Sequence, residues 1–113
     1  GAYTVKLTVN GTTYTQPLTL KMDPRAKITP LGLSQQFRLA TRIVDMMNRS
    51  FAALSSPQPQ APSHLDALKT INADLATAYD VVESADRAPT TQAAKAVAAL
   101  ERRLIKLIGR PTP

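Results

Sequence analysis

The chain has 113 residues, a net charge of +6 and no cysteine. This length fits one domain, and the lack of cysteine excludes a disulfide framework, thiolate zinc sites and cysteine nucleophiles. No run of residues approaches the ~18 apolar residues of a membrane span, and no signal peptide is visible. Gly1 is interpreted as a leftover of tag removal, with the native N-terminus missing.

The first predicted element is a β-hairpin over residues 3–22. Apolar and polar residues alternate in YTVKLTV, as in a half-buried strand. Asn10-Gly11 is the commonest pair in a type I′ turn, because both positions need a positive φ. A two-residue turn there pairs Val9 with Thr12 and gathers the apolar side chains of both strands on one face. The candidate interface residues on this face are Tyr3, Val5, Leu7, Tyr14, Leu18 and Leu20.

This hairpin is predicted to need a partner. Pro17 falls opposite Thr4 at a non-hydrogen-bonded pair, so the return strand is an edge strand there or is bulged. A lone two-stranded hairpin is marginal in water. Its apolar face must therefore pack against the helices, a second copy of the chain, or an upstream sheet.

Residues 23–32 are predicted to form a linker, because Asp23-Pro24, Thr29-Pro30 and Gly32 all interrupt regular structure. The alternative is that the end of this segment enters a helix, with Thr29 as its N-cap and Pro30 in its first position. The two interpretations differ in where the first helix begins.

Three amphipathic helices are predicted next, over about residues 34–54, 64–85 and 91–108. Short connections favour an up-down-up bundle that occupies residues 33–113. Ser63 is the expected N-cap of the second helix, with Asp66 three residues later as in a capping box. Thr90 is the expected N-cap of the third helix, and Gly109 its stop. The predicted fold is therefore mainly α, a three-helix bundle preceded by a hairpin.

Each helix has an apolar seam that is expected to face the core. The seam of the first helix keeps a strict four–three spacing, which is a heptad pattern: Leu33, Phe37, Ala40, Val44, Met47, Phe51 and Leu54. Leu39, Ile43 and Met46 widen this seam into a broad apolar face, as a helix with two neighbours needs. The other two seams are Leu65, Leu68, Asn72, Leu75, Tyr79 and Val82, and Ala93, Val97, Leu100, Leu104 and Leu107. The polar Asn72 can fix register or oligomeric state, although a position at the margin of the seam is the plainer interpretation.

The best candidate for a contact with an anion or a partner is a basic cluster in the last helix. Its members are Arg102, Arg103, Lys106 and Arg110. The plainer interpretation is that these cations complement the helix dipole and add solubility. Nucleic acid is not the expected partner, because basic residues are spread over the helices without the aromatic repeats of single-strand binders.

No residue is predicted to be catalytic, and no metal or cofactor is expected. His64, the only histidine, lies at a predicted helix start without partners for metal or triad chemistry. Asp80, Glu83 and Asp86 gather near the end of the second helix. Paired carboxylates hydrolyse glycosides across a cleft, and a narrow helical bundle offers none.

Two stretches resemble a known family. YTVKLTVNGTTYTQPLTLKMDPR is similar to the strand pair that ends the β-sandwich of large bacterial proteins with BNR or Asp-box repeats. These are sortilin-like β-propellers commonly labelled glycosyl hydrolases. INADLATAYDVVESADRAPT, residues 71–90, resembles their helical tail. The resemblance implies a C-terminal piece of a secreted or periplasmic protein, in which residues 1–22 are the last strands of a sandwich and the propeller carries any active site.

The expected function is therefore a non-catalytic structural or interaction module of a BNR-repeat, glycosyl-hydrolase-like protein. Its expected partners are the other domains of the parent chain, with a homodimer through the hairpin as a second option. A basic helical module that binds an anionic polymer or a partner protein is the alternative function. A carbohydrate-processing fragment is the least supported.

Overall fold

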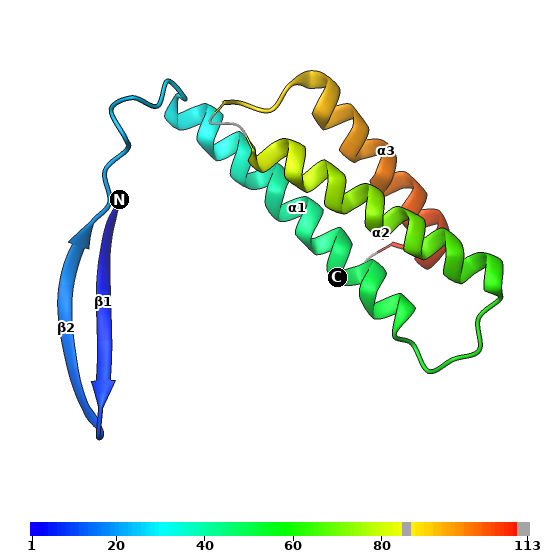
Figure 1. Ribbon diagram of the computed structural model, residues 1–113, viewed down its shortest axis with the longest axis horizontal. Coiled ribbons are helices and arrows are strands. Elements are labelled where there is room, and N and C mark those ends of the chain that lie inside the picture. Colours follow the sequence, from blue (N-terminus) through cyan, green and yellow to red (C-terminus); the bar gives the residue numbers. More distant parts are fainter. Residues whose placement is uncertain (85–86, 111–113) are drawn as a thin grey trace.

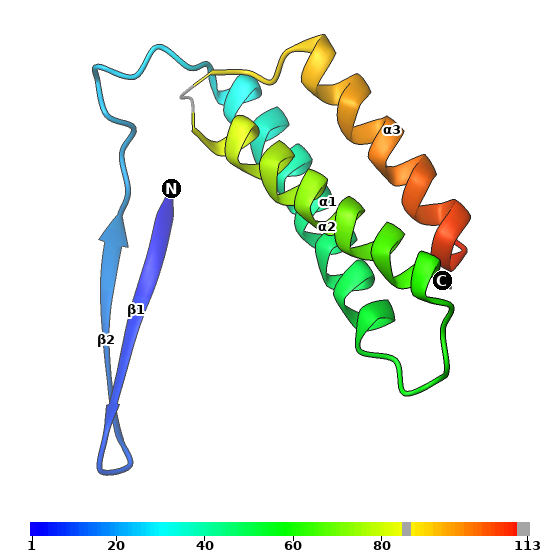
Figure 2. The ribbon, with the colours of Figure 1, turned by 45° about the vertical axis from the view of Figure 1, so that its right-hand side comes forward.

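The computed structural model describes residues 1–84 and 87–110, and it contains a hairpin followed by three helices (Figure 1). The strands β1 (Ala2–Val9) and β2 (Thr12–Thr19) are antiparallel. The helices are α1 (Pro30–Leu54), α2 (Pro62–Glu83) and α3 (Thr91–Ile108). The predicted fold class, a mainly α protein with an N-terminal hairpin, is confirmed. Figure 2 shows the hairpin standing apart from the bundle.

The hairpin has the register that its turn predicts. Asn10 and Gly11 have φ values of 49° and 80°, so both adopt the positive φ that a type I′ turn requires. The pairs run from Val9 opposite Thr12 to Ala2 opposite Thr19. Because the side-chain period of a strand is two, this register places all the large apolar side chains on one face.

The first helix begins earlier than residue 34. Thr29 is the N-cap, and its Oγ1 accepts a hydrogen bond from the Gly32 backbone N–H at 3.0 Å, while Pro30 is the first helical residue. The helix-entry interpretation is therefore right, and the linker does not extend to residue 32. Gly32 lies inside the first turn and is buried. A Cβ added there would lie 3.2 Å from the Ala88 Cβ, so this glycine permits close packing against the connection before α3.

Both ends of α3 are the ones that the sequence predicts, but the start of α2 is not. Thr90 Oγ1 accepts from the Ala93 N–H at 3.1 Å, and Gly109, with φ of 80°, follows the last residue of α3. The N-cap of α2 is Ala61, which makes no side-chain cap bond. The prediction of Ser63 as N-cap is wrong, because Pro62 occupies the first helical position and starts the helix two residues before the expected start at residue 64.

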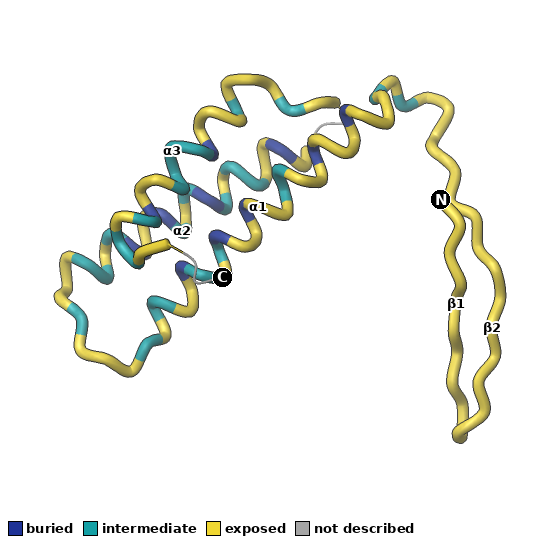
Figure 3. Tube along the Cα trace, turned by 180° about the vertical axis from the view of Figure 1, so that it is seen from behind, coloured by how far each residue is buried: buried dark blue, intermediate teal, exposed yellow. Residues whose placement is uncertain are grey.

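The core lies entirely between the three helices (Figure 3). Its fully or nearly fully buried apolar residues are Ile43, Met46, Leu68, Ile71, Leu75, Val82, Val97 and Leu104. Burial of each such side chain contributes about 1.5–3 kcal/mol. In α2 and α3, most of these residues belong to the predicted seams.

The predicted apolar face of α1 is right only in part, because Ala40, Met47 and Leu54 pack against the core but the other seam positions do not. Phe37 and Phe51 are 71% and 66% exposed, and the buried side of the helix instead carries Ile43, Met46 and Ser50. Each residue advances an α-helix by 100°, so Phe37 and the buried Ile43 lie about 120° apart around the helix axis. The apolar arc of α1 is wider than the contact that α2 and α3 make with it, and Leu33, Phe37, Val44 and Phe51 lie on its uncovered part.

A buried polar contact joins α1 to α2. Asn72 Nδ2 donates to Ser50 Oγ at 2.6 Å, and the fully buried Ser50 hydroxyl donates to the Met47 carbonyl at 2.9 Å. Buried polar groups need such partners, because leaving one unpaired costs about 1–3 kcal/mol. Asn72 on the α2 seam therefore holds one alignment of α1 against α2.

Candidate interaction surface

The apolar side of the hairpin, here called the hairpin face, lies in solvent. It comprises Tyr3, Val5, Leu7, Val9, Tyr14, Leu18 and Leu20, each between 43% and 59% exposed. Among the described residues, neither strand contacts a helix, and every residue of β1 and β2 is exposed. The structure thus brings the six predicted interface residues together on one surface, with Val9 beside them.

The two sides of the hairpin differ in chemistry. The opposite side is largely threonine, and Thr8 and Thr13 form a cross-strand hydroxyl hydrogen bond of 3.1 Å. Beyond β2 the ladder continues, because the Gly1 ammonium donates to the Leu20 carbonyl at 2.6 Å and the Leu20 N–H donates to the Gly1 carbonyl at 2.9 Å. The apolar side is therefore a continuous surface over residues 3–20, and the opposite side of the hairpin presents threonine hydroxyl groups.

The segment between β2 and α1 is shaped by one local turn. The Asp23 carboxylate accepts from the Arg25 N–H at 2.9 Å and from the Arg25 guanidinium at 2.7 Å, and the Ala26 N–H donates to the Asp23 carbonyl at 3.0 Å. These hydrogen bonds from Arg25 lower the pKa of Asp23. Pro24 favours such a turn because its ring fixes φ.

The predicted basic cluster is divided in the structure. Arg103 Nη1 lies 2.8 Å from Asp74 Oδ2, so this side chain is turned toward α2. Arg102 and Lys106 are exposed and four residues apart, which places them on one side of α3. Arg110 follows the helix end. Within residues 1–84 and 87–110, these three cations form no ion pair or hydrogen bond through their side chains.

Two arginines of α1 reach α3, a contact that the sequence did not reveal. Arg42 forms a bidentate ion pair with Glu101, which lowers the pKa of Glu101 and raises that of Arg42. Arg49 Nη2 donates to the Gly109 carbonyl at 2.8 Å. A helix C-terminus leaves carbonyls unpaired and favours a nearby cation, so Arg49 caps α3 from another helix.

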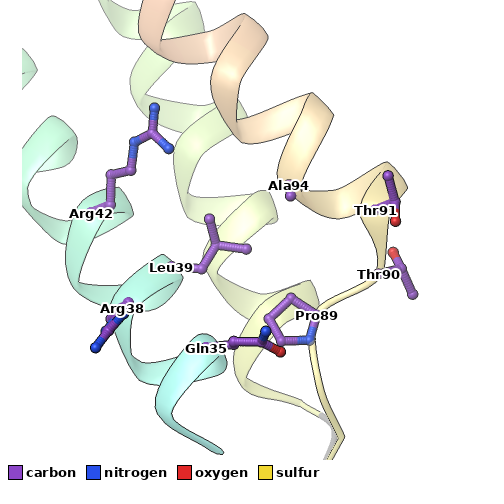
Figure 4. Close-up of a pocket in the computed structure, with 8 residues that line it drawn as sticks. All are labelled: Gln35, Arg38, Leu39, Arg42, Pro89, Thr90, Thr91 and Ala94. Atoms are coloured by element: carbon purple, nitrogen blue, oxygen red, sulfur yellow. The ribbon is translucent and has the colours of Figure 1, made fainter. Parts of the chain in front are cut away.

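Two open grooves flank α3. The first, about 440 Å³, lies between α1 and the start of α3 (Figure 4), and its lining comprises Gln35, Arg38, Leu39, Arg42, Pro89, Thr90, Thr91 and Ala94. Figure 4 shows Gln35 extended toward Pro89 and the Arg38 guanidinium directed away from α3. The second, about 390 Å³, separates α2 from α3 and is lined mainly by alanine and valine. Neither groove brings together a nucleophile and a base.

The acidic end of α2 does not line these grooves. Tyr79 Oη donates to Glu83 Oε1 at 2.8 Å, and this hydrogen bond raises the pKa of Tyr79. Asp80 is exposed, and Asp86 lies outside the described residues. His64 is half-buried in the first turn of α2. In the described part of the chain, no group of three His, Cys, Asp or Glu residues is placed to hold a metal ion.

None of the helices in the described ranges combines the length and the apolar character needed to cross a membrane. Comparison of the chain with protein-family models, curated proteins and solved structures finds no match. The surface that these residues offer most plainly is the hairpin face.

Proposed function

We propose that this chain is a non-catalytic structural and interaction module, and that its hairpin face joins it to the other domains of a larger protein. The observation that carries the proposal is the hairpin itself, which holds seven large apolar side chains in solvent and contacts no described helix. The resemblance to the ends of BNR-repeat, glycosyl-hydrolase-like proteins supports a secreted parent of that type.

Docking of the hairpin face has a clear thermodynamic reason. An isolated hairpin is marginally stable, because two strands bury too little surface. Covering the hairpin face removes on the order of 500 Å² of apolar area from water. At ~25 cal/mol per Å², this contributes about 12 kcal/mol before the entropy of association is subtracted. A partner surface therefore stabilises the hairpin as well as binding it.

The two edges of the hairpin are not equivalent. Thr4 pairs with Pro17, so the outward-pointing donor at that position of β2 is missing. The outer edge of β1 contains no proline and presents an unbroken row of backbone groups. A partner strand therefore pairs with β1, while the hairpin face packs against the partner's interior, as in strand addition to a sheet.

Amide hydrogen exchange tests this proposal directly. The chain is compared with the longer protein obtained by extending it upstream along its reading frame. We expect hairpin amides to exchange at least about 100-fold more slowly in the longer protein, with helix amides unchanged. Unchanged hairpin protection, or a reading frame with no β-rich domain upstream, would refute the proposal.

Paired substitutions on the two sides of the hairpin provide the matched control. Leu7→Ser with Tyr14→Ser removes apolar groups from the hairpin face and should abolish the added protection. Thr4→Ser with Thr15→Ser changes the opposite side and should preserve it. Equal losses in both variants would indicate that the strands simply unfold, and docking through the hairpin face would then be rejected.

A basic module that binds an anionic polymer is the second candidate, favoured by the exposed pair Arg102 and Lys106 on one side of α3. Charge reversal of both should abolish binding to heparin or to an oligonucleotide, with a steep dependence on salt. Arg38→Glu with Lys95→Glu, on other exposed surfaces, is the charge-matched control. Binding that survives reversal of Arg102 and Lys106 would exclude this candidate.

A further inference from the structure

A second apolar surface runs along the outside of α1. It is here called the α1 stripe and comprises Leu33, Phe37, Val44 and Phe51, which are 42%, 71%, 38% and 66% exposed. Phe37 and Phe51 are the only phenylalanines in the chain. Both of these large apolar side chains therefore lie on the surface of a bundle whose core is aliphatic.

The spacing of the residues in the α1 stripe indicates that a helix covers it. Phe37, Val44 and Phe51 recur every seven residues, and the half-buried Ala40, Met47 and Leu54 complete a four–three pattern at the edge of the core. Such a pattern keeps one line of a helix facing another helix. The stripe is about 27 Å long at 1.5 Å per residue, and α2 and α3 pack against a different arc of α1.

The charges around the α1 stripe allow a second copy of this chain to approach it. With a net charge of +6, two copies repel each other unless they meet at an uncharged surface. The residues on the outer flank of the stripe, Ser34, Thr41 and Asn48, are exposed and uncharged. Among the α1 cations, Arg42 and Arg49 are engaged with α3. Beyond the uncharged flank lie the exposed Arg38 and Asp45, which carry opposite charges.

The area of the α1 stripe reaches the lower limit for a specific dimer. The exposed parts of two phenylalanines amount to about 250 Å² in each copy. Leu33, Val44 and the polar flank raise the contact to on the order of 500 Å² per copy, or about 1,000 Å² in all. An interface of this size is typical of a weak or transient dimer.

We propose that the α1 stripe is a homodimer interface, in which α1 of one copy packs against α1 of a second copy through the same residues. The interface is isologous, because one surface meets its own copy across a two-fold axis. It lies on the bundle and does not include the hairpin, so it is independent of the hairpin docking proposed above.

Solution mass across a concentration series tests the dimer. Sedimentation or light scattering from about 10 μM to 1 mM should show a rise from monomer toward dimer. Phe37→Ser with Phe51→Ser should keep the chain monomeric throughout, and it should fold because both side chains are already largely exposed. Helical content measured by circular dichroism checks that folding. A wild-type chain that stays monomeric at the highest concentration would overturn the proposal.

A hairpin variant separates this interface from the hairpin face. Tyr3→Ser with Tyr14→Ser also removes two exposed aromatic side chains and should leave the dimer intact. If this variant abolishes the dimer while the phenylalanine variant retains it, the copies associate through the hairpin and the α1 interface is rejected. The hairpin proposal is judged by hydrogen exchange, so either proposal can fail alone.

Cross-linking locates the contact, because the chain has no cysteine of its own. Val44→Cys places one thiol in the middle of the α1 stripe, and Lys95→Cys places one on the exposed side of α3. A short bis-maleimide should link the Val44→Cys chains into covalent dimers and leave the Lys95→Cys chains monomeric. Equal yields for the two variants would show random collision and contradict the proposed interface.

Discussion

The bundle buries its large apolar side chains, whereas the hairpin leaves its own exposed to solvent. In the bundle, side chains such as Ile43 and Leu75 are fully enclosed by neighbouring helices. In the hairpin, Leu7 and Tyr14 are paired across the two strands, yet both are 59% exposed. Local pattern is sufficient to form either element, but only a second layer can bury its apolar side. The bundle supplies its own second layer, and the hairpin receives none from the described helices.

The largest expected contrast comes from truncating one leucine in each region. Leu75→Ala removes a fully buried side chain and should lower the free energy of unfolding by about 2–5 kcal/mol. Leu7→Ala should change it by less than about 0.5 kcal/mol, because Leu7 is largely exposed. Denaturant unfolding monitored by helical circular dichroism measures both. Similar losses would show that the hairpin packs on the bundle in solution.

Removing the polar contact between α1 and α2 should have the next largest effect. Asn72→Ala deletes the donor to the buried Ser50 hydroxyl and should cost about 1–3 kcal/mol of unfolding free energy. Gln92→Ala, at an exposed position of α3, is the control and should be nearly neutral. A neutral Asn72→Ala variant would mean that apolar packing alone aligns the two helices.

The ion pair between α1 and α3 should contribute less and should depend on pH. Glu101→Gln should cost at most about 1 kcal/mol at neutral pH, because the pair is partly exposed. The folded-state pKa of Glu101 is lowered, so its contribution is complete above the unfolded value of about 4.3 and is lost as pH falls through the folded value. The wild-type and Glu101→Gln stabilities should therefore converge in acid; a constant difference would contradict this assignment.

The smallest expected effect on the bundle follows from disrupting the hairpin turn. Gly11 has φ of 80°, so Gly11→Ala should weaken the turn by about 1 kcal/mol. Amide exchange in β1 and β2 should accelerate, while the thermal midpoint of the helices stays the same. A lower midpoint for the helices would show that the two regions unfold together.

The sequence predicts the elements well because their signals are local. Asn10-Gly11 determines the hairpin register, and Thr29, Thr90 and Gly109 each mark a helix end through a bond or a backbone angle within a few residues. The prediction of Ser63 as the N-cap of α2 is wrong because Ser63 and Pro62 both favour helix starts, and Pro62 occupies the first helical position.

The sequence predicts surfaces less well, because exposure depends on contacts between distant residues. Nothing near Phe37 says that α2 and α3 cover the side of α1 that carries Ile43. Of the heptad positions, Ala40, Met47 and Leu54 pack against the core, whereas Phe37, Val44 and Phe51 do not. The basic cluster is a second example. Arg103 pairs with Asp74, which lies twenty-nine positions earlier in the chain, and nothing in the local sequence distinguishes Arg103 from the unpaired Arg102 in the described part of the chain.

The segment between β2 and α1 has a consequence for the spacing of a larger assembly. Residues 20–29 can span up to about 33 Å, and the Asp23–Arg25 turn shortens that reach. Each bundle therefore carries its hairpin on a short tether. Two bundles paired through their first helices would therefore hold the two hairpins, and the domains that cover them, within a tether's length of the dimer. The length of this tether, more than the strength of either contact, would then set how far apart the two proteins can lie.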